Sequence, residues 1–181
     1  NLLMYIILFG SLWTYIPFLI EKKFMSSSIL NGFVLGGMSL AASIISLFFG
    51  KISLKVKPEK LFIFGFILVS VSLVSVTFMP EWYFLFIPMA IFGAGFGIIL
   101  PNIQSLVIKL APENHRGAIV SLNRTISLLG QFLGPVIAGF ILYFYPSGLE
   151  GINLLFYVFS TLAIVTIGVS QLAFTNKNGS I

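Results

Sequence analysis

Two polar side chains, Arg124 and Gln131, interrupt an apolar stretch of this sequence and are the strongest candidates for contact with a solute. They are seven residues apart, so on a helix they share a face and could line a polar pathway. There Arg124 could bind an anionic group or a carboxylate of another helix. Alternatively, its long side chain snorkels to the lipid headgroups or pairs with Glu113 in the preceding loop. Because an arginine at the centre of a spanning helix costs roughly 2.5 to 3.5 kcal/mol, its position needs one of these explanations.

Amide and aromatic side chains supply the remaining candidates. Asn102 and Gln104 follow Pro101, where they could bind a substrate or satisfy the backbone groups that a proline leaves free. Tyr5 and Trp13 could line a cavity, although tryptophan and tyrosine are also typical of the membrane interface. The candidate lining residues are Arg124, Gln131, Asn102, Gln104, Asn123, Tyr5 and Trp13.

These residues form neither a catalytic set nor a metal-binding set. The sequence has no aspartate and no cysteine, and its five glutamates lie in loops or at the ends of apolar runs. The one histidine, His115, lies in a loop without other ligands near it, whereas a metal site needs several. We therefore predict no enzymatic activity, no metal and no cofactor. The formal net charge of +5 comes from short loops, so we also predict no nucleic-acid partner.

Membrane-spanning helices are the elements that must position the candidate residues. Of the 181 residues, 58% are hydrophobic and only 8% are charged, with a mean hydropathy of +1.08; soluble domains carry about 25% charged residues. Such a chain lies in the lipid bilayer, where a spanning segment must bond its own backbone as a helix. The sequence therefore predicts an all-α, polytopic membrane protein. Six apolar runs are long enough to span, at about 2–20, 28–50, 61–79, 83–110, 117–145 and 152–174.

The distribution of positive charge predicts the orientation. The connections after the first, third and fifth runs carry only Lys22 and Lys23. The other connections and the C-terminal tail carry Lys51, Lys55, Lys57, Lys60, Lys109, Arg116 and Lys177. Lysine and arginine are enriched on the cytoplasmic side of membrane proteins. We therefore expect a multi-pass protein of the plasma membrane with a cytoplasmic C-terminus.

Small residues follow one face of the second, fourth and fifth runs. Such faces let helix backbones approach closely, so we expect them to pack helices together. The residues are Gly32, Gly36, Ser39 and Ser43, then Gly93, Gly97 and Pro101, then Gly130, Gly134, Pro135 and Gly139. The third and sixth runs are rich in Phe, Leu, Ile and Val, and we expect them to face lipid. The first three runs and the last three share a pattern: the middle run of each has a small-residue face, and the third is rich in large apolar residues. This pattern predicts two inverted three-helix repeats, which are typical of secondary transporters.

One loop and two helices resemble the major facilitator superfamily. The residues concerned are Pro112-Glu-Asn-His-Arg-Gly117, Ser121 and Leu129-Gly-Gln-Phe-Leu-Gly134-Pro135-x-x-x-Gly139, together with Gly93-x-Gly-x-Gly97-x-x-x-Pro101. The first group is similar to the tenth loop and eleventh helix of the family, and the second to its tenth helix. The resemblance covers the whole chain as the C-terminal six-helix half of a twelve-helix transporter. It implies a missing N-terminal six-helix half, in keeping with a chain that opens at Asn1 inside an apolar run.

The resemblance leans toward bacterial drug-efflux members. It implies secondary active transport by alternating access, with proton-coupled export of small amphipathic or drug-like compounds, so the partners are a small-molecule substrate and protons. One loop departs from the family pattern, because Gly50 to Pro58 reads GKISLKVKP, with Leu54 at the usual aspartate position and Lys57 at a usual glycine. Two alternatives stay open. One is uptake of an organic anion or other small solute, with Arg124 as the anion's partner, and the other is a non-transporting six-helix scaffold subunit.

Overall fold

The computed structural model describes residues 1–24, 28–145 and 148–178, with side chains described at 1–24, 29–145 and 148–171. The described chain is helical throughout. Its α-helices and its short π (η1) and 3-10 (η2, η3) segments are, in order, α1 (Leu2–Ile7), η1 (Leu8–Trp13), α2 (Thr14–Phe24), α3 (Ser28–Lys55), α4 (Pro58–Thr77), η2 (Trp82–Leu85), α5 (Phe86–Leu110), η3 (Glu113–His115), α6 (Arg116–Phe144) and α7 (Leu149–Asn178).

Each of the six predicted apolar runs coincides with a helix long and apolar enough to cross a membrane, although α4 ends at Thr77 and α6 at Phe144, before the predicted ends at 79 and 145. Segments α1, η1 and α2 together make the first span. The helices extend beyond the predicted runs, to Phe24 in the first span, to Lys55 in α3 and to Asn178 in α7. The reason is physical: hydropathy marks only the part that fits the hydrocarbon, whereas the backbone hydrogen bonds continue through polar residues.

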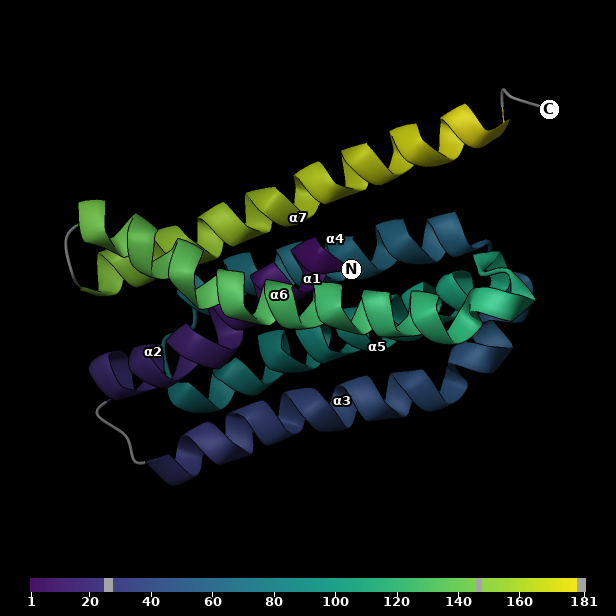
Figure 1. The fold of residues 1–181 in the computed structure, drawn as a ribbon. Coiled ribbons are helices and arrows are strands. Elements are labelled where there is room, and N and C mark those ends of the chain that lie inside the picture. Colours follow the sequence, from purple (N-terminus) through teal and green to yellow (C-terminus); the bar gives the residue numbers. More distant parts are fainter. Residues whose placement is uncertain (25–27, 146–147, 179–181) are drawn as a thin grey trace.

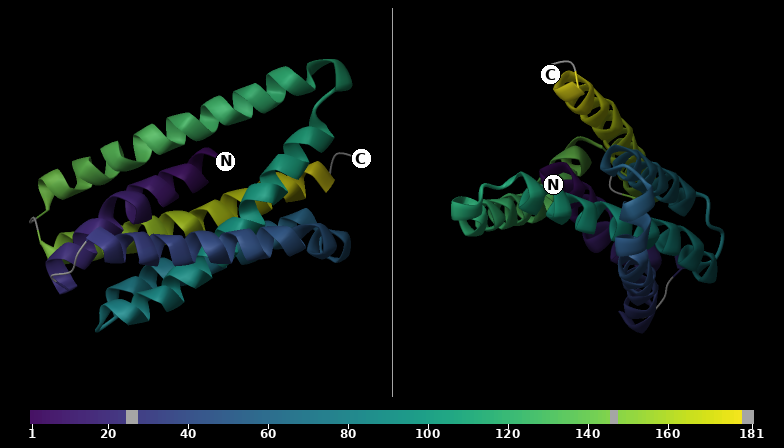
Figure 2. Two further views of the ribbon diagram at one scale, coloured as in Figure 1. Left: turned by 90° about the horizontal axis from the view of Figure 1, so that it is seen from below. Right: turned by 90° about the vertical axis from the view of Figure 1, so that its right-hand side faces the viewer.

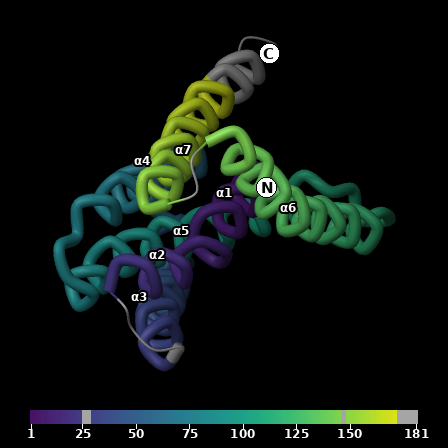
Figure 3. The backbone as a smooth tube through the Cα atoms, turned by 90° about the vertical axis from the view of Figure 1, so that its left-hand side faces the viewer, coloured from purple at the N-terminus to yellow at the C-terminus, as the bar shows by residue number. Residues whose placement is uncertain are grey.

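Helices α1 and α5 lie at the centre of the bundle, and the other helices surround them on three sides (Figure 2 and Figure 3). Seen end-on, α3, α6 and the α4–α7 pair point outward from α1 and α5 (Figure 2, right, and Figure 3). In the first span, 67% of the apolar window is buried inside the described chain, against 17% in α3 and 22% in α6. Helices α3 and α6 therefore each keep a long apolar face that no described residue covers.

Glycines of α5 fix this helix between two neighbours. A methyl group at Gly97 would lie 2.5 Å from the carbonyl oxygen of Ala42 on α3, and Gly93 approaches the same helix at Met38. A methyl group at Gly95 would lie 2.7 Å from the carbonyl oxygen of Gly65 on α4. Residues two apart on a helix point to nearly opposite sides. The alternating glycines thus bring α3 and α4 to backbone contact on opposite sides of α5.

Glycines of α6 make a second close crossing, against the first span. A methyl group at Gly130 would lie 2.7 Å from the carbonyl oxygen of Leu2, and one at Gly134 would lie 2.7 Å from the amide nitrogen of Gly10. Gly139 has open space around it among the described residues. The half-buried Pro101 and Pro135 lie inside α5 and α6.

The small-residue face of α3 behaves differently. A methyl group added at Gly32 or Gly36 would meet no described atom within 4 Å, and Ser39 and Ser43 are exposed. Helix α3 packs on α5 through another side, which includes Met38. The predicted packing role of Gly32, Gly36, Ser39 and Ser43 therefore has no partner within the described chain and stays a prediction.

Helices α4 and α7 pack against each other. The hydroxyls of Ser70 and Ser160 are buried and 2.7 Å apart, and the Thr77 hydroxyl lies 3.0 Å from that of Tyr157. The expectation that these helices face lipid therefore applies only to their outer sides, where Val71 is exposed.

Positive charge gathers at one end of the bundle. The α3–α4 and α5–α6 connections lie at the end where α7 finishes, whereas α2 ends and α7 begins at the opposite end (Figure 1). The basic side chains near the first of these ends are Lys51, Lys55, Lys57, Lys60, Lys109 and Arg116. The side chain of Lys177 lies outside the described residues. At the other end Lys23 donates to the carbonyl of Met79 at 2.7 Å and so satisfies a backbone oxygen after α4.

Candidate functional site

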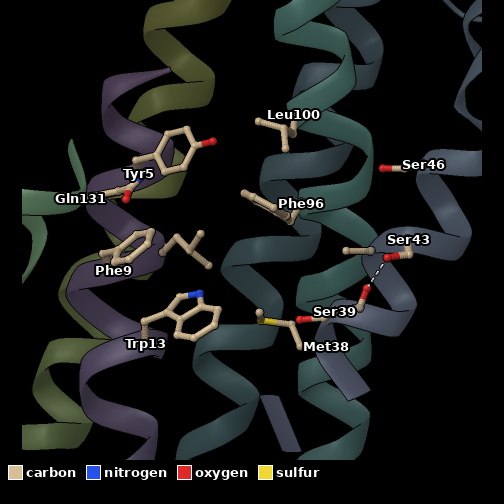
Figure 4. A pocket seen from close by; sticks show the side chains of 12 residues that line it. Tyr5, Phe9, Trp13, Met38, Ser39, Ser43, Ser46, Phe96, Leu100 and Gln131 are labelled. Carbon is tan, nitrogen blue, oxygen red and sulfur yellow. Dashed lines mark hydrogen bonds between the residues drawn. The ribbon is translucent and has the colours of Figure 1, made fainter. Parts of the chain in front are cut away.

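A cavity of about 420 Å³ lies between the first span, α3, α5 and α6. It is lined by Tyr5, Leu8, Phe9, Trp13, Met38, Ser39, Ala42, Ser43, Ser46, Phe96, Leu100 and Gln131. Figure 4 shows the aromatic side chains of the first span facing the serines of α3 across this space, which we call the aromatic cavity. Ligand sites typically have 300 to 1,000 Å³ and mainly apolar walls, so the cavity is large enough for a small organic molecule.

A π-helical segment presents the aromatic wall. The rings of Phe9 and Trp13 stack with centroids 6.0 Å apart, and Tyr5 meets Phe96 of α5 edge-on at 6.4 Å. The Thr14 hydroxyl donates to the carbonyl of Phe9 at 2.7 Å, across the widened turn. Short π segments inside α-helices occur often at functional sites. The wall is therefore a flat aromatic surface on which a planar ring can stack.

Both walls of the aromatic cavity offer polar atoms. On α3 the Ser39 hydroxyl donates to the carbonyl of Leu35 at 3.1 Å, and the Ser43 hydroxyl donates to that of Ser39 at 2.8 Å. Their protons are engaged, so their oxygens remain as acceptors. The Tyr5 hydroxyl and the Trp13 indole N–H have no hydrogen-bond partner among the described residues. The aromatic cavity thus combines apolar walls with a few free donors and acceptors, the usual composition of a small-molecule site.

A second pocket of about 280 Å³ adjoins the first at Tyr5 and Leu100. It lies between α5, α6 and the start of α1, and we call it the polar pocket. Its lining residues are Asn1, Tyr5, Leu100, Ile103, Gln104, Val107, Ile108, Val120, Asn123, Arg124 and Ser127. Arg124 is its one charged side chain.

Arg124 is exposed and makes no hydrogen bond or ion pair with a described residue. The expected alternative partner, Glu113, instead approaches Arg116 at 3.9 Å. Arg124 and Glu113 form no ion pair among the described residues. The guanidinium has five donors in a planar fork that fits a carboxylate or a phosphate. In the polar pocket this fork is free to receive an anion.

The neighbouring amides divide into engaged and free groups. Asn123 accepts a 2.7 Å hydrogen bond at its side-chain oxygen from the amide of Asn1, which also donates to the Ser127 hydroxyl at 2.7 Å. Gln104 is exposed on the α5 side of the polar pocket. Asn102 is only 2% exposed and donates to the carbonyl of Pro58 at 2.8 Å. Asn102 therefore ties α5 to the start of α4 and lines neither cavity.

The structure thus groups the predicted residues in two adjoining places. Trp13 and Gln131 line the aromatic cavity, Gln104, Asn123 and Arg124 line the polar pocket, and Tyr5 lines both. The sequence did not single out the cavity residues Phe9, Phe96 and Met38, because one apolar side chain looks like another in a hydrophobic run. The π segment was also missed. Its signal is Pro17, whose missing N–H and ring disturb the hydrogen bonds of the preceding turn.

The family follows from a match over nearly the whole chain. The family model of the Major Facilitator Superfamily matches residues 2–179. This chain belongs to the Major Facilitator Superfamily. Members of this superfamily are membrane transporters and not enzymes, and the six candidate spans are those of a multi-pass membrane protein.

Several curated bacterial proteins are similar to this chain. The tetracycline resistance protein, class B, of Escherichia coli is 30% identical over 152 residues, which are 81% of this chain and 37% of the relative. The bacillibactin exporter of Bacillus subtilis (strain 168) is 29% identical over 131 residues, which are 71% of this chain and 32% of the relative. A multi-drug resistance efflux pump PmrA homolog of Lactococcus lactis is 26% identical over 118 residues, 63% of this chain and 29% of the relative. The chain spans about a third of the length of these relatives.

Proposed function

We propose that this chain is the C-terminal half of a proton-coupled exporter of small amphipathic compounds. The observation that carries the proposal is the aromatic cavity, whose lining includes residues of α3 and α6, the two helices with the least buried apolar windows. Its stacked rings suit the apolar part of such a compound, and its free polar atoms suit the rest. The names of the relatives, which include exporters and efflux pumps, support export as the direction.

The uncovered faces of α3 and α6 support the assignment as one half of a transporter. A second six-helix bundle placed over them completes the walls of the cavity. The small residues Gly32, Gly36, Ser39 and Ser43 let that bundle approach α3 closely and slide on it. Rocking of the two halves about the cavity then exposes it alternately to the two sides of the membrane. We place the lysine-rich end of the bundle in the cytoplasm, at the plasma membrane.

Coupling to protons requires a titratable group that this chain does not offer near the cavity. Its glutamates lie in connections or in the first or last turns of helices; they are Glu21, Glu59, Glu81, Glu113 and Glu150. We therefore assign the proton-carrying carboxylate to the N-terminal half, where it faces the same central space.

A transport assay on the full-length protein tests this proposal. In inverted membrane vesicles we expect the neutral amphiphile N-phenyl-1-naphthylamine to accumulate when an acid-inside proton gradient is imposed, and a protonophore to abolish this accumulation. Trp13→Ala removes an aromatic wall and should reduce the initial rate about tenfold.

The second tryptophan provides the matched control. Trp82 lies in η2 at the end of the bundle and lines neither cavity, so Trp82→Ala should transport like the wild type. Residues 1–181 alone should not transport, because they supply only part of the pathway. Equal transport by the Trp13→Ala and wild-type proteins, or accumulation that survives the protonophore, would rule out the proposed role of the cavity or the proposed coupling.

A further inference from the structure

We propose that the aromatic cavity and the polar pocket, which together we call the groove, select an amphipathic organic anion. The anionic group would lie beside Arg124 in the polar pocket, and the apolar body would lie in the aromatic cavity. This inference rests on the proposed transport function and specifies its substrate class. It follows from three features of the described chain: the two cavities adjoin, their polarity differs, and the charge they hold has one sign.

The two cavities adjoin and have unlike linings. Tyr5 and Leu100 line both, so the cavities meet at these two side chains. On α6, Arg124 lines the polar end and Gln131 lines the aromatic end. Seven residues of helix correspond to about 10 Å, which is the length of a small two-ring molecule. A single solute can therefore contact both ends at once.

The polar end is suited to an anion by its free donors. The Arg124 side chain has no partner among the described residues, and Gln104 faces the same pocket from α5. An arginine fork can donate two parallel hydrogen bonds to a carboxylate or sulfonate, and charge-assisted bonds of this kind are the stronger ones. The apolar Ile103, Val107 and Ile108 line the same pocket, and their side chains offer the anion no competing polar group.

The aromatic end has no charge that competes for this anion or attracts a cation. Its lining residues include no lysine, arginine, histidine or glutamate, and Gln131 is the one side-chain amide among them. Its stacked Phe9 and Trp13 rings suit an apolar, planar group. The described part of the groove therefore has one charged side chain, Arg124, at one end and a mainly apolar surface at the other. This arrangement is complementary to an amphipathic anion.

Two probes that differ by one anionic group test the inference. 1-Anilinonaphthalene-8-sulfonate carries a sulfonate on the ring system of N-phenyl-1-naphthylamine, and both become fluorescent in apolar sites. We expect the full-length protein, purified in dodecyl maltoside and again in phosphatidylcholine nanodiscs, to bind the sulfonate more tightly. In Arg124→Gln the sulfonate should bind roughly 10- to 100-fold more weakly, with the neutral probe unchanged. Arg124→Lys should restore part of the preference, since it returns the charge without the fork.

A second arginine on the same helix supplies the control. Arg116 lies eight residues before Arg124, outside both cavities and beside Glu113, so Arg116→Gln removes the same charge without touching the groove. It should leave both affinities unchanged. If Arg116→Gln weakens binding of the sulfonate probe as much as Arg124→Gln does, the overall charge of the protein sets the preference and the inference is wrong.

The remaining outcomes separate the alternatives. If the preference for the sulfonate probe is seen in maltoside but not in nanodiscs, a lipid phosphate occupies Arg124. If Arg124→Gln lowers the affinity for both probes, Arg124 pairs with a carboxylate of the full-length protein. Either result overturns the inference, as does an absence of binding or of preference in the wild type. Gradient-driven movement of the neutral probe reports on the proposed transport separately. If it persists without a sulfonate preference, transport stands and the substrate class does not.

Discussion

Two helices with the same kind of small-residue face have opposite surroundings in this structure. On α6, Gly130 and Gly134 lie against the backbone of the first span, where a methyl group would come within 2.7 Å of another main-chain atom. On α3, Gly32 and Gly36 have open space around them. The comparison teaches that regular spacing of small residues shows which helices can approach closely. It does not show which partner they approach, or whether that partner belongs to the same bundle.

The largest expected effect comes from filling the α6 crossing. Gly134→Leu forces a side chain against the Gly10 amide and the Ile6 carbonyl, which cannot move without separating two helices. We expect a loss of about 3 kcal/mol, near the upper range for overpacking. The measurement is the midpoint of thermal aggregation of the full-length protein in detergent. Gly139→Leu is the control on the same helix, because Gly139 meets no described atom. Equal midpoints for the two variants would contradict the close crossing.

A smaller effect is expected where α5 crosses α3. Gly97→Ala places a methyl group 2.5 Å from the carbonyl oxygen of Ala42, so the two backbones must separate, at a cost of about 1 to 3 kcal/mol. The matched change on the open face of α3 is Gly36→Ala. It should be neutral or stabilising by up to about 1 kcal/mol in residues 1–181, since alanine favours the helix. If Gly36→Ala destabilises the full-length protein but not residues 1–181, the partner of that face lies in the rest of the protein.

The smallest of the three effects separates two neighbouring amides on α5. Asn102→Ala removes the part-buried hydrogen bond to the carbonyl of Pro58 and should cost about 1 kcal/mol. Gln104→Ala removes an exposed side chain of the polar pocket and should leave stability unchanged. Unfolding of both variants in denaturing detergent measures the difference. The opposite order of stabilities would show that Asn102 does not tie α5 to α4.

The six spans could be predicted from the sequence because twenty successive apolar residues are a signal that no local contact overrides. Four of the predicted small residues, Gly93, Gly97, Gly130 and Gly134, lie where a methyl group would meet a neighbouring helix, whereas Gly139 has open space among the described residues. The partners were not predictable: nothing local distinguishes Gly134, which touches Gly10, from Gly36, which touches no described residue.

The candidate site was predictable only in its polar members. Arg124, Gln131 and Gln104 stand out in apolar runs, and each lines one of the two cavities. Asn102 stands out equally, yet its side chain is used to bond a backbone carbonyl, and only the position of α4 decides this. Phe9 and Phe96 are two of twenty phenylalanines, and their place in the cavity wall depends on helix rotation and on the π segment.

The alternating glycines of α5 have a mechanical consequence. Helices α3 and α4 are held to α5 at backbone distance and α7 packs on α4, so we expect these four helices to move together. Gly10 of the first span also lies against Phe159 of α7. The first span and α6 form the other closely packed group. The aromatic cavity lies between the two groups, with α3 and α5 on one side and η1 and α6 on the other. A solute bound there acts as a noncovalent crosslink between them. Its binding should raise the unfolding temperature, roughly with the logarithm of its concentration above Kd, so a thermal-shift screen of candidate compounds can find substrates before any transport is measured.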